Sequence, residues 1–159
     1  MIVVSDNSAL SALAEIGLLD LLPRLFGQVV IPEAVRSESG HAGAPQRLRD
    51  WIAAPPEWLH IVPDPDHNLL ETLCLGPGEA AAITLAWENR RDSLLILDEK
   101  RGRQVAEALG LQKTGLLGII AEAAERRWLD FDETLGRLVQ TGFHIREPLI
   151  EAVRKRLHP

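Results

Sequence analysis

The sequence of 159 residues contains one cysteine, Cys74, and no tyrosine. A single cysteine cannot form an intrachain disulfide, and it excludes a zinc site built mainly from cysteines. No run approaches the ~18 apolar residues of a membrane helix. The apolar start MIVVS lacks a basic leader and is interrupted by Asp6, so we expect no signal peptide and no membrane attachment. These absences fit a protein of the reducing cytoplasm.

An excess of positive charge is also lacking, since 17 lysines and arginines stand against 23 acidic residues and the formal net charge at pH 7 is −6. This balance argues against a protein that coats nucleic acid through a broad positive potential. It does not exclude a nuclease, because an enzyme that gathers carboxylates around a cation is acidic and needs only local basic side chains to contact phosphates. The candidates for such contacts are Arg36, Arg47, Arg49, Arg90, Arg91, Lys100, Arg101 and Arg103.

The rest of the composition favours one compact domain over residues 1–159, because 46% of the residues are hydrophobic and no linker or repeat interrupts the chain. Short apolar runs alternate with helical patterns, which predicts parallel strands joined by helices in a three-layer α/β/α sandwich. The expected strands are 2–5, 28–31, 58–62, 93–97 and 111–114, and the expected helices are 7–14, 18–26, 32–38, 47–53, 79–90, 100–110, 115–128, 131–140 and 146–157.

Local signals refine some boundaries of these elements. Asn7 or Ser8 is predicted to cap the first helix, and Pro32 to be the first residue of the third. Pro23 predicts a break or kink in the helix LLDLLPRLF. Prolines on both sides of the run 58–62 favour an edge strand. Gly110 is predicted to end the helix that begins at residue 100.

Four acidic residues stand at the ends of separate apolar segments, namely Asp6, Glu38, Glu79 and Asp98. A parallel sheet gathers the carboxyl ends of its strands along one edge, so these side chains are expected to converge. Hard oxygen ligands suit Mg²⁺ or Mn²⁺, and without a cation the carboxylates would repel one another. Glu79 has a second interpretation, because a carboxylate in the first turn of a helix is favoured by the helix dipole alone.

The four segments VVSDNSAL, VVIPEAVRSE, LGPGEAAAITLA and LLILDEKRGRQVAEALGLQKTGLLGII resemble the PIN-domain ribonucleases, and within them the VapC-like toxin branch and its PIN-like relatives. The resemblance covers about residues 2–128, and the helices within 131–157 lie outside these motifs. It implies an α/β/α fold, Mg²⁺ or Mn²⁺ as cofactor and hydrolysis of RNA. It also implies that Asp6, Glu38 and Asp98 bind the metal, with Glu79 as a fourth acid acting directly or through water.

Several assignments stay open at this stage. Glu99 competes with Asp98 as the acid after the strand, and Glu33 could replace Glu38 if the helix register differs. Ser8 either caps a helix or holds a metal-bound water. Thr114 either caps the following helix or turns its hydroxyl toward the acids, and Arg101 is a possible substrate contact. The loop 39–45 is either a substrate-contacting arm or a plain solvent loop.

The resemblance also implies partners. Toxins of this type pair with a small antitoxin protein and commonly form homodimers. An apolar stripe (Leu13, Leu18, Leu19 and Leu22) could form such a surface, although core packing is the default interpretation of that spacing. The alternative function is a non-catalytic PIN-like binding protein. A haloacid-dehalogenase-like enzyme is disfavoured, because Ser8 stands where it needs a second aspartate, and a receiver-like signalling domain is disfavoured, because its paired acids are missing.

Overall fold

The computed structural model describes residues 1–66 and 75–159. Cys74 therefore lies outside the described residues. Five short strands form one parallel sheet in the order β3-β2-β1-β4-β5. The strands are β1 (Ile2–Ser5), β2 (Val29–Pro32), β3 (Leu59–Val62), β4 (Ser93–Ile96) and β5 (Lys113–Thr114). The parallel sheet predicted from the sequence is confirmed, and β3 is an edge strand as its flanking prolines indicate.

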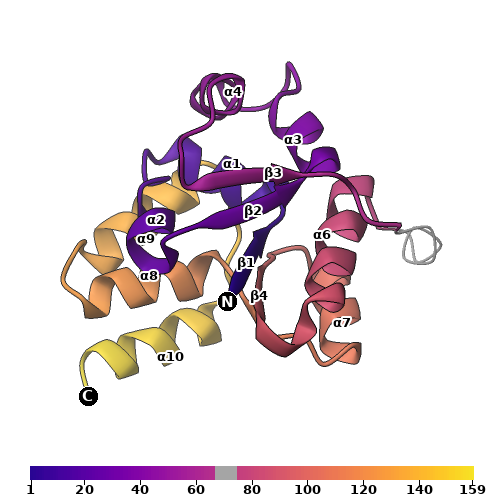
Figure 1. Ribbon diagram of the computed structural model, residues 1–159. Helices are drawn as coiled ribbons and strands as arrows, with labels where there is room; N and C mark the ends of the chain where they lie inside the picture. The colour runs from indigo at the N-terminus through magenta and orange to yellow at the C-terminus, as the bar shows by residue number, and fades with distance from the viewer. Residues whose placement is uncertain (67–74) are drawn as a thin grey trace.

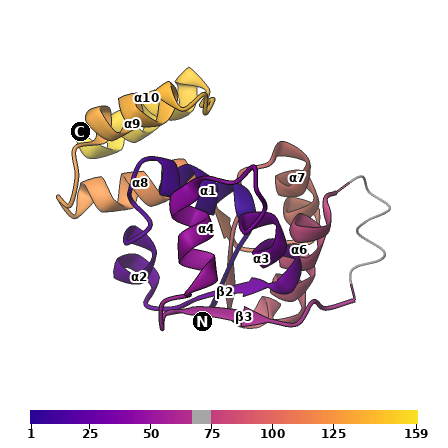
Figure 2. The same ribbon diagram turned by 90° about the horizontal axis from the view of Figure 1, so that it is seen from above.

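Helices cover both faces of the sheet, which gives the predicted three-layer α/β/α architecture (Figure 1). The helices α6 and α7 lie on one face, and α1, α2 and α8 lie on the other, with α9 and α10 packed outside α8 (Figure 2). The bounds are α1 (Asn7–Glu15), α2 (Leu21–Phe26), α3 (Glu33–Ser39), α4 (Gln46–Ala53), α6 (Pro77–Glu88), α7 (Lys100–Ala108), α8 (Leu116–Glu125), α9 (Phe131–Gln140) and α10 (Glu147–Leu157). A 3₁₀ turn, η1 (Arg90–Asp92), precedes β4.

The order of the strands fixes where a ligand can bind. The chain moves from β1 to β2 and β3 on one side and then returns to place β4 and β5 on the other side. β1 pairs with β4 in the register Ser5↔Ile96 at their carboxyl ends and with β2 through Val4↔Val30. The strand order therefore reverses at β1, and in open α/β sheets ligands bind outside the carboxyl ends of the strands at such a point.

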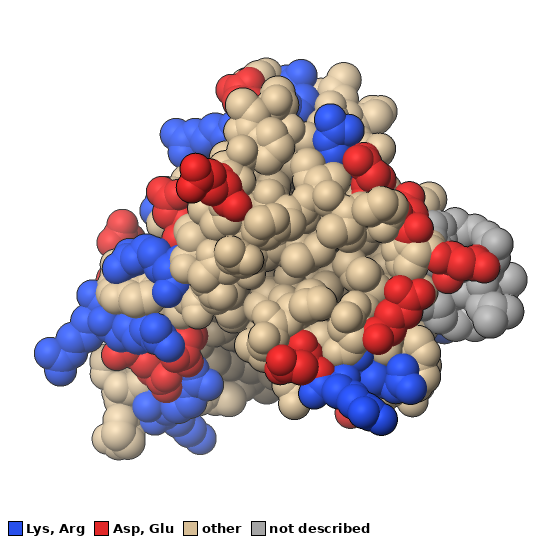
Figure 3. Space-filling model, viewed as in Figure 1, with Lys and Arg blue, Asp and Glu red and all other residues tan. Residues whose placement is uncertain are grey.

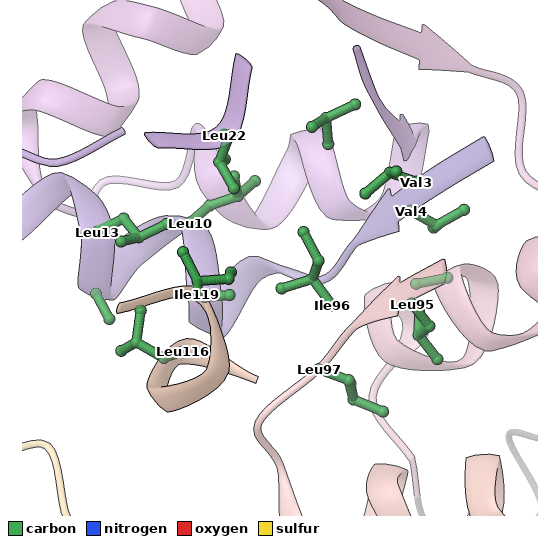
Figure 4. Packing of buried hydrophobic residues seen from close by; sticks show 14 of the residues in the cluster. Val3, Val4, Leu10, Leu13, Leu22, Leu95, Ile96, Leu97, Leu116 and Ile119 are labelled. Atoms are coloured by element: carbon green, nitrogen blue, oxygen red, sulfur yellow. The ribbon is translucent and has the colours of Figure 1, made fainter. Parts of the chain in front are cut away.

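The core explains why these segments become strands. Val3, Val4, Leu95 and Ile96 are each at most 2% exposed, as expected for central strands of a sheet covered on both faces. On the α1 and α8 side, Leu10, Leu13, Leu116 and Ile119 lie close together, and Leu22 lies beside Leu10 (Figure 4). Leu13 and Leu22 are thus core residues, which supports the default interpretation of the leucine stripe. Leu18 and Leu19 are only partly buried against the same core.

Three boundary predictions are corrected by the structure. The N-cap of α1 is Asp6, whose side chain accepts a hydrogen bond from the Ala9 backbone N–H, so the prediction of Asn7 or Ser8 was wrong. Pro32 ends β2 and occupies the N-cap position of α3, and the helix begins one residue later than predicted. Pro23 breaks nothing, because α2 begins at Leu21 and Pro23 falls in its first turn, where no helical hydrogen bond from its nitrogen is needed.

Gly110 follows the end of α7 with a φ of +70° and donates its backbone N–H to the Glu107 carbonyl, in agreement with its predicted role at the helix end. No helix within residues 1–66 and 75–159 has the length and apolar character needed to cross a membrane.

Candidate metal centre at the carboxyl edge of the sheet

Asp6 occupies the middle of the carboxyl edge, directly after β1 and beside the end of β4. Its backbone N–H donates to the Ile96 carbonyl at 3.2 Å, which extends the pairing of the two strands up to the acid. The side chain is 2% exposed and accepts hydrogen bonds from the Ser8 hydroxyl (2.7 Å) and from the Ala9 N–H (3.2 Å). Ser8 therefore orients the carboxylate of Asp6.

Burial raises the pKa of Asp6 to about 7. The hydrogen bonds from Ser8 and Ala9 lower this pKa, and the negative charges of Asp98 and Glu79 raise it again. A carboxylate with this environment is poorly compensated by the protein alone. A cation at this position would favour its charged form.

Asp98 lies two residues after the end of β4, the strand that pairs with β1. Both of its oxygens lie 3.1 Å from the backbone N–H of Leu116, the first residue of α8. Burial raises the pKa of Asp98, while the Leu116 N–H and the positive charge of Arg103 lower it. Arg103 also donates to the Leu97 carbonyl at 3.2 Å, so its guanidinium is held next to this acid.

Glu79 lies in the first turn of α6 and has a hydrogen-bond acceptor that the described residues leave unsatisfied. Its Oε2 atom is buried and accepts no hydrogen bond within the described part of the chain. Burial raises the pKa of Glu79, and the charges of Glu99 and Glu38 raise it further, while the Gly76 backbone N–H lowers it. Helix-dipole stabilisation, the alternative interpretation, leaves this orphaned oxygen unexplained, because a buried acceptor without a partner is costly.

Glu38 reaches the same edge from the last turn of α3. Its Oε1 accepts the backbone N–H of Gly78 at 2.8 Å, at the start of α6. Glu33, the alternative, is exposed and forms an ion pair with Arg36 at 3.4 Å. The structure thus places Glu38 next to the first turn of α6 and places Glu33 in an ordinary surface pair.

The start of a helix faces three of the four acids. Backbone N–H groups in the first turns of α1, α6 and α8 donate to Asp6, Glu38 and Asp98 respectively. Partial positive charge at helix N-termini stabilises carboxylates there. The fold therefore tolerates a cluster of acids before any cation binds, with Asp6 and Asp98 at the ends of β1 and β4 and the two glutamates on helices beside them.

Glycines make room for these side chains, a feature that the sequence prediction missed. A Cβ atom on Gly78 would lie 2.3 Å from Glu38 Oε1, one on Gly102 would lie 2.7 Å from Glu79 Oε2, and one on Gly115 would lie 2.6 Å from Asp98 Oδ1. None of the three has a positive φ. Their small size, rather than their backbone freedom, is what the site requires.

The other predicted residues have less direct positions. Glu99 is exposed and forms the N-cap of α7, close enough to Glu79 to raise its pKa. The Thr114 hydroxyl lies 3.5 Å from the Gly115 carbonyl and does not cap α8, whose N-cap is Gly115. Arg101 is exposed on α7. Arg103 was included only among general phosphate contacts, although it lies against Asp98.

The chemistry of the four acidic side chains suits a divalent cation, although the carboxylates do not surround a single point. Among residues 1–66 and 75–159, no three carboxylate, imidazole or thiol side chains form a set that could hold a metal ion as they stand. The donor set is nevertheless all oxygen, and the buried Oε2 of Glu79 receives no hydrogen bond from the described residues. Hard oxygen ligands of this kind, few in number, are what Mg²⁺ and Mn²⁺ take in proteins.

The structure is thus a parallel α/β/α sandwich of the class in which acidic side chains lie beside the carboxyl ends of the central strands. Within that class, a model of the PIN-domain family matches residues 2–159, so the chain belongs to the PIN-domain family, whose fold is generally nuclease-like. The match extends through α9 and α10, which the sequence motifs left outside. No curated protein matches the chain.

Proposed function

We propose that this protein is an endoribonuclease that requires Mg²⁺ or Mn²⁺ and hydrolyses RNA phosphodiester bonds. The observation that carries the proposal is the convergence of Asp6, Asp98 and Glu79 at the carboxyl edge, where burial raises all three pKa values and neighbouring carboxylates raise those of Asp6 and Glu79 further. Membership of the PIN-domain family, whose fold is generally nuclease-related, supports it. Clustered groups with perturbed pKa values are typical of active sites.

In this proposal Asp6, Glu38 and Asp98 hold the cation, and Glu79 contributes its free oxygen directly or through water. When bound, the cation would lower the pKa of an attacking water and neutralise charge at the phosphate. Ser8 keeps one oxygen of Asp6 in place, and the N–H groups of Gly78 and Leu116 keep Glu38 and Asp98 in place. Partners of this kind fix the direction in which ligands point.

Arg103 is a basic residue that the described structure places beside Asp98, so it is suited to contact a phosphate oxygen of the substrate. The same guanidinium partly offsets the negative charge of the cluster. Because the cluster is acidic, the rest of the substrate would be held by neutral contacts and scattered arginines. Figure 3 shows acidic side chains beside α3 and α6 near the ends of β2 and β3, and a largely uncharged surface over the two strands.

The finer assignment follows the resemblance to the VapC-like branch. We propose that the enzyme is the toxin of a toxin–antitoxin pair, acts in the cytoplasm, forms a homodimer and is inhibited by a small antitoxin protein. Expression of the intact gene should then arrest growth, and Asp6→Asn or Asp98→Asn should relieve the arrest. Growth arrest that persists in both variants would remove the nuclease as its cause.

The decisive test is biochemical. Thermal stability is measured as Mn²⁺ or Mg²⁺ is added to the unmutated protein, to Asp6→Asn and to Asp98→Asn, and cleavage of single-stranded RNA is followed in parallel. A ligand that binds only the folded state raises its stability. The unmutated protein should gain stability and cut RNA, and both variants should lose most of the gain and at least ~100-fold in cleavage rate.

A non-catalytic PIN-like binding protein is the second candidate. It is supported by the arrangement of the carboxylates, which do not surround a single point in the described residues. It predicts RNA binding without cleavage, and no effect of either substitution on that binding. The same set of measurements separates the two functions.

A further inference from the structure

A groove lies beside the acidic cluster, between α1, α3 and the loop that follows α3, and its lining combines apolar surface with a few polar side chains. Its volume is about 590 Å³, inside the range of ~300–1,000 Å³ that is usual for small-molecule sites. One wall is a stripe along α1 formed by Asn7, Ser11 and Glu15, which are spaced one turn apart, and the other wall includes Glu38 and His41. The two helices pack side by side (Figure 2). Because Asn7 follows Asp6 and Glu38 belongs to both features, the groove opens at the cluster.

The charges of the groove exclude a phosphate as its occupant. Its lining contains two carboxylates, Glu15 and Glu38, and neither lysine nor arginine among the described residues. The Nδ1 atom of His41 accepts the Gly43 backbone N–H at 3.2 Å, so the protein already occupies this ring nitrogen. An anion would meet uncompensated negative charge here. An uncharged group that has both apolar surface and hydrogen-bonding atoms fits better.

The side-chain amide of Asn7 is positioned to donate hydrogen bonds into the groove. Its Oδ1 accepts the hydroxyl of Ser39 at 2.8 Å and that of Ser11 at 3.3 Å. Ser39 is fully buried, so this contact ties the amide to the wall of the groove. The acceptor end of the amide is thus occupied by the protein, and no described residue accepts a hydrogen bond from its Nδ2. Two N–H groups remain for a ligand.

We propose that this groove binds the nucleoside next to the phosphate that is cleaved, and that Asn7 donates its amide hydrogens to an acceptor atom of the base. A nucleoside is uncharged, is of suitable size and carries carbonyl oxygens and ring nitrogens that accept hydrogen bonds. Since the amide offers only donors, it would discriminate between bases by the acceptors that they present. The inference extends the proposed nuclease and rests on it for the identity of the adjoining phosphate.

The first experiment uses the full chain without metal and does not depend on cleavage. Adenosine, guanosine, cytidine and uridine are added separately to ¹⁵N-labelled protein, and the side-chain NH₂ signals of Asn7 are followed by NMR. At least one nucleoside should shift these signals in a saturable way. If all four leave the Asn7 signals unchanged, or if the shifts cluster around Trp87 and Arg90 at the far end of the sheet, the inference is wrong.

Two variants sharpen the measurement. Asn7→Asp keeps an oxygen that can accept from Ser39 and Ser11 but has no N–H, so it preserves the wall of the groove and removes the donors. Binding of the responsive nucleoside, followed through the backbone signals of Ser11 and His41, should weaken about tenfold. Asn7→Ala should weaken it by a similar factor. Asn89→Ala, the matched control, removes an asparagine whose amide donates to the Leu85 carbonyl outside the groove. The control should bind as the unmutated protein does, and equal weakening in the control would overturn the assignment of Asn7.

A second experiment ties the groove to cleavage. With Mn²⁺ and short RNAs that differ in one base beside the cut, Asn7→Ala should raise KM about tenfold for the preferred base, leave kcat within about threefold and flatten the preference. The two proposals fail separately. If RNA is not cut but nucleosides reach Asn7, the nuclease assignment fails and the binding site stands. If RNA is cut and base preference is the same with and without Asn7, the groove assignment fails alone.

Discussion

Two regions of the described structure bring several carboxylates close to an arginine, and they differ in burial. On the helices α9 and α10, Arg154 contacts Asp132, Glu147 and Glu151 at 3.0, 3.6 and 2.6 Å, and all of these side chains are well exposed. At the carboxyl edge of the sheet, Asp98 and Glu79 act on the buried Asp6 by repulsion, with Arg103 beside Asp98.

The difference separates charges that the protein satisfies from charges that it leaves unsatisfied. Water and the guanidinium of Arg154 compensate the exposed carboxylates on α9 and α10, so these ion pairs contribute little to stability. The buried set has an acid with a pKa of about 7 and a carboxylate oxygen that receives no hydrogen bond from the described residues. Such an arrangement costs stability in the absence of a cation, and a cost of this kind is typical of functional sites.

The largest expected effect concerns Asp6 and pH. Its folded pKa of about 7 exceeds its ordinary value of 3.8, so the folded state binds more protons than the unfolded state between these pH values. The free energy of unfolding of the metal-free protein should therefore fall as pH rises from 5 to 8, by about 3 kcal/mol from this residue. Asp6→Asn, which still caps α1, should abolish most of this fall.

Denaturant unfolding at a series of pH values, with a chelator present, measures the effect. With Mn²⁺ the dependence should reverse, because the cation binds the charged carboxylate and its stabilisation grows as Asp6 loses its proton. Equal slopes for the unmutated protein and Asp6→Asn would show that burial and the neighbouring acids do not oppose the charge of Asp6 in the folded state.

The second prediction compares glycines in the two regions. Gly102→Ala places a methyl group 2.7 Å from Glu79 Oε2 and 3.1 Å from the Leu97 side chain, and Gly78→Ala places one on Glu38. Each should destabilise the protein by ~1–3 kcal/mol through overpacking and should displace an acid, with loss of Mn²⁺-induced stabilisation. Thermal unfolding with and without Mn²⁺ measures both effects.

Gly136 provides the matched control, since it lies in α9 and an added methyl group would meet no neighbouring side chain of the described residues within 4 Å. Gly136→Ala should raise stability by ~0.5–1 kcal/mol, because alanine favours helix and nothing obstructs it. If Gly102→Ala behaves like Gly136→Ala, the close packing of glycine against Glu79 is not a requirement of the site.

The sequence was sufficient to predict the parallel sheet and the edge to which Asp6 and Asp98 belong, because both follow from short apolar runs and parallel connections. It was also sufficient to prefer Glu38 as a hypothesis, since helical spacing directs that residue toward the strand ends. It could not distinguish Asp6 as the N-cap from Asn7 or Ser8, because all three residues suit that position and the choice depends on the end of β1.

Local sequence patterns could not predict which residues surround and orient the acids. The contacts of Gly78 with Glu38, Gly102 with Glu79 and Gly115 with Asp98 join residues from different elements, and no spacing rule relates them. The hydrogen bond between Ser39 and Asn7 spans 32 positions in the chain. A glycine inside a helical pattern, such as Gly102, was the one available signal of close approach, and it is a weak one.

The third prediction tests the arginine beside the buried set. Arg103→Gln removes the charge that lowers the pKa of Asp98, so this pKa should rise further. At pH 8 the metal-free protein should lose about 1–2 kcal/mol, since the positive charge beside Asp98 is missing and the charged donor to the Leu97 carbonyl is lost. Stabilisation by Mn²⁺ should increase, because the cation no longer shares Asp98 with a guanidinium. Arg103→Lys, which keeps the charge, is the control, and thermal unfolding with and without Mn²⁺ is the measurement. A decrease in Mn²⁺ stabilisation as large as that of Asp98→Asn would instead assign Arg103 to holding Asp98 in place.

The smallest effect is expected for the exposed set. Arg154→Gln removes the cation that contacts Asp132, Glu147 and Glu151, and this leaves three carboxylates that water solvates well. The melting temperature should fall by less than about 2 °C, and the small difference should vanish in ~1 M salt, where charges on the surface are screened. The same salt should leave the pH dependence due to Asp6 largely intact, since its side chain is buried. Thermal unfolding of Arg154→Gln and Asp6→Asn at low and high salt measures this contrast. A salt response of equal size at Arg154 and at Asp6 would mean that burial does not distinguish the two sets, and the reason for expecting a cation at the carboxyl edge would be lost.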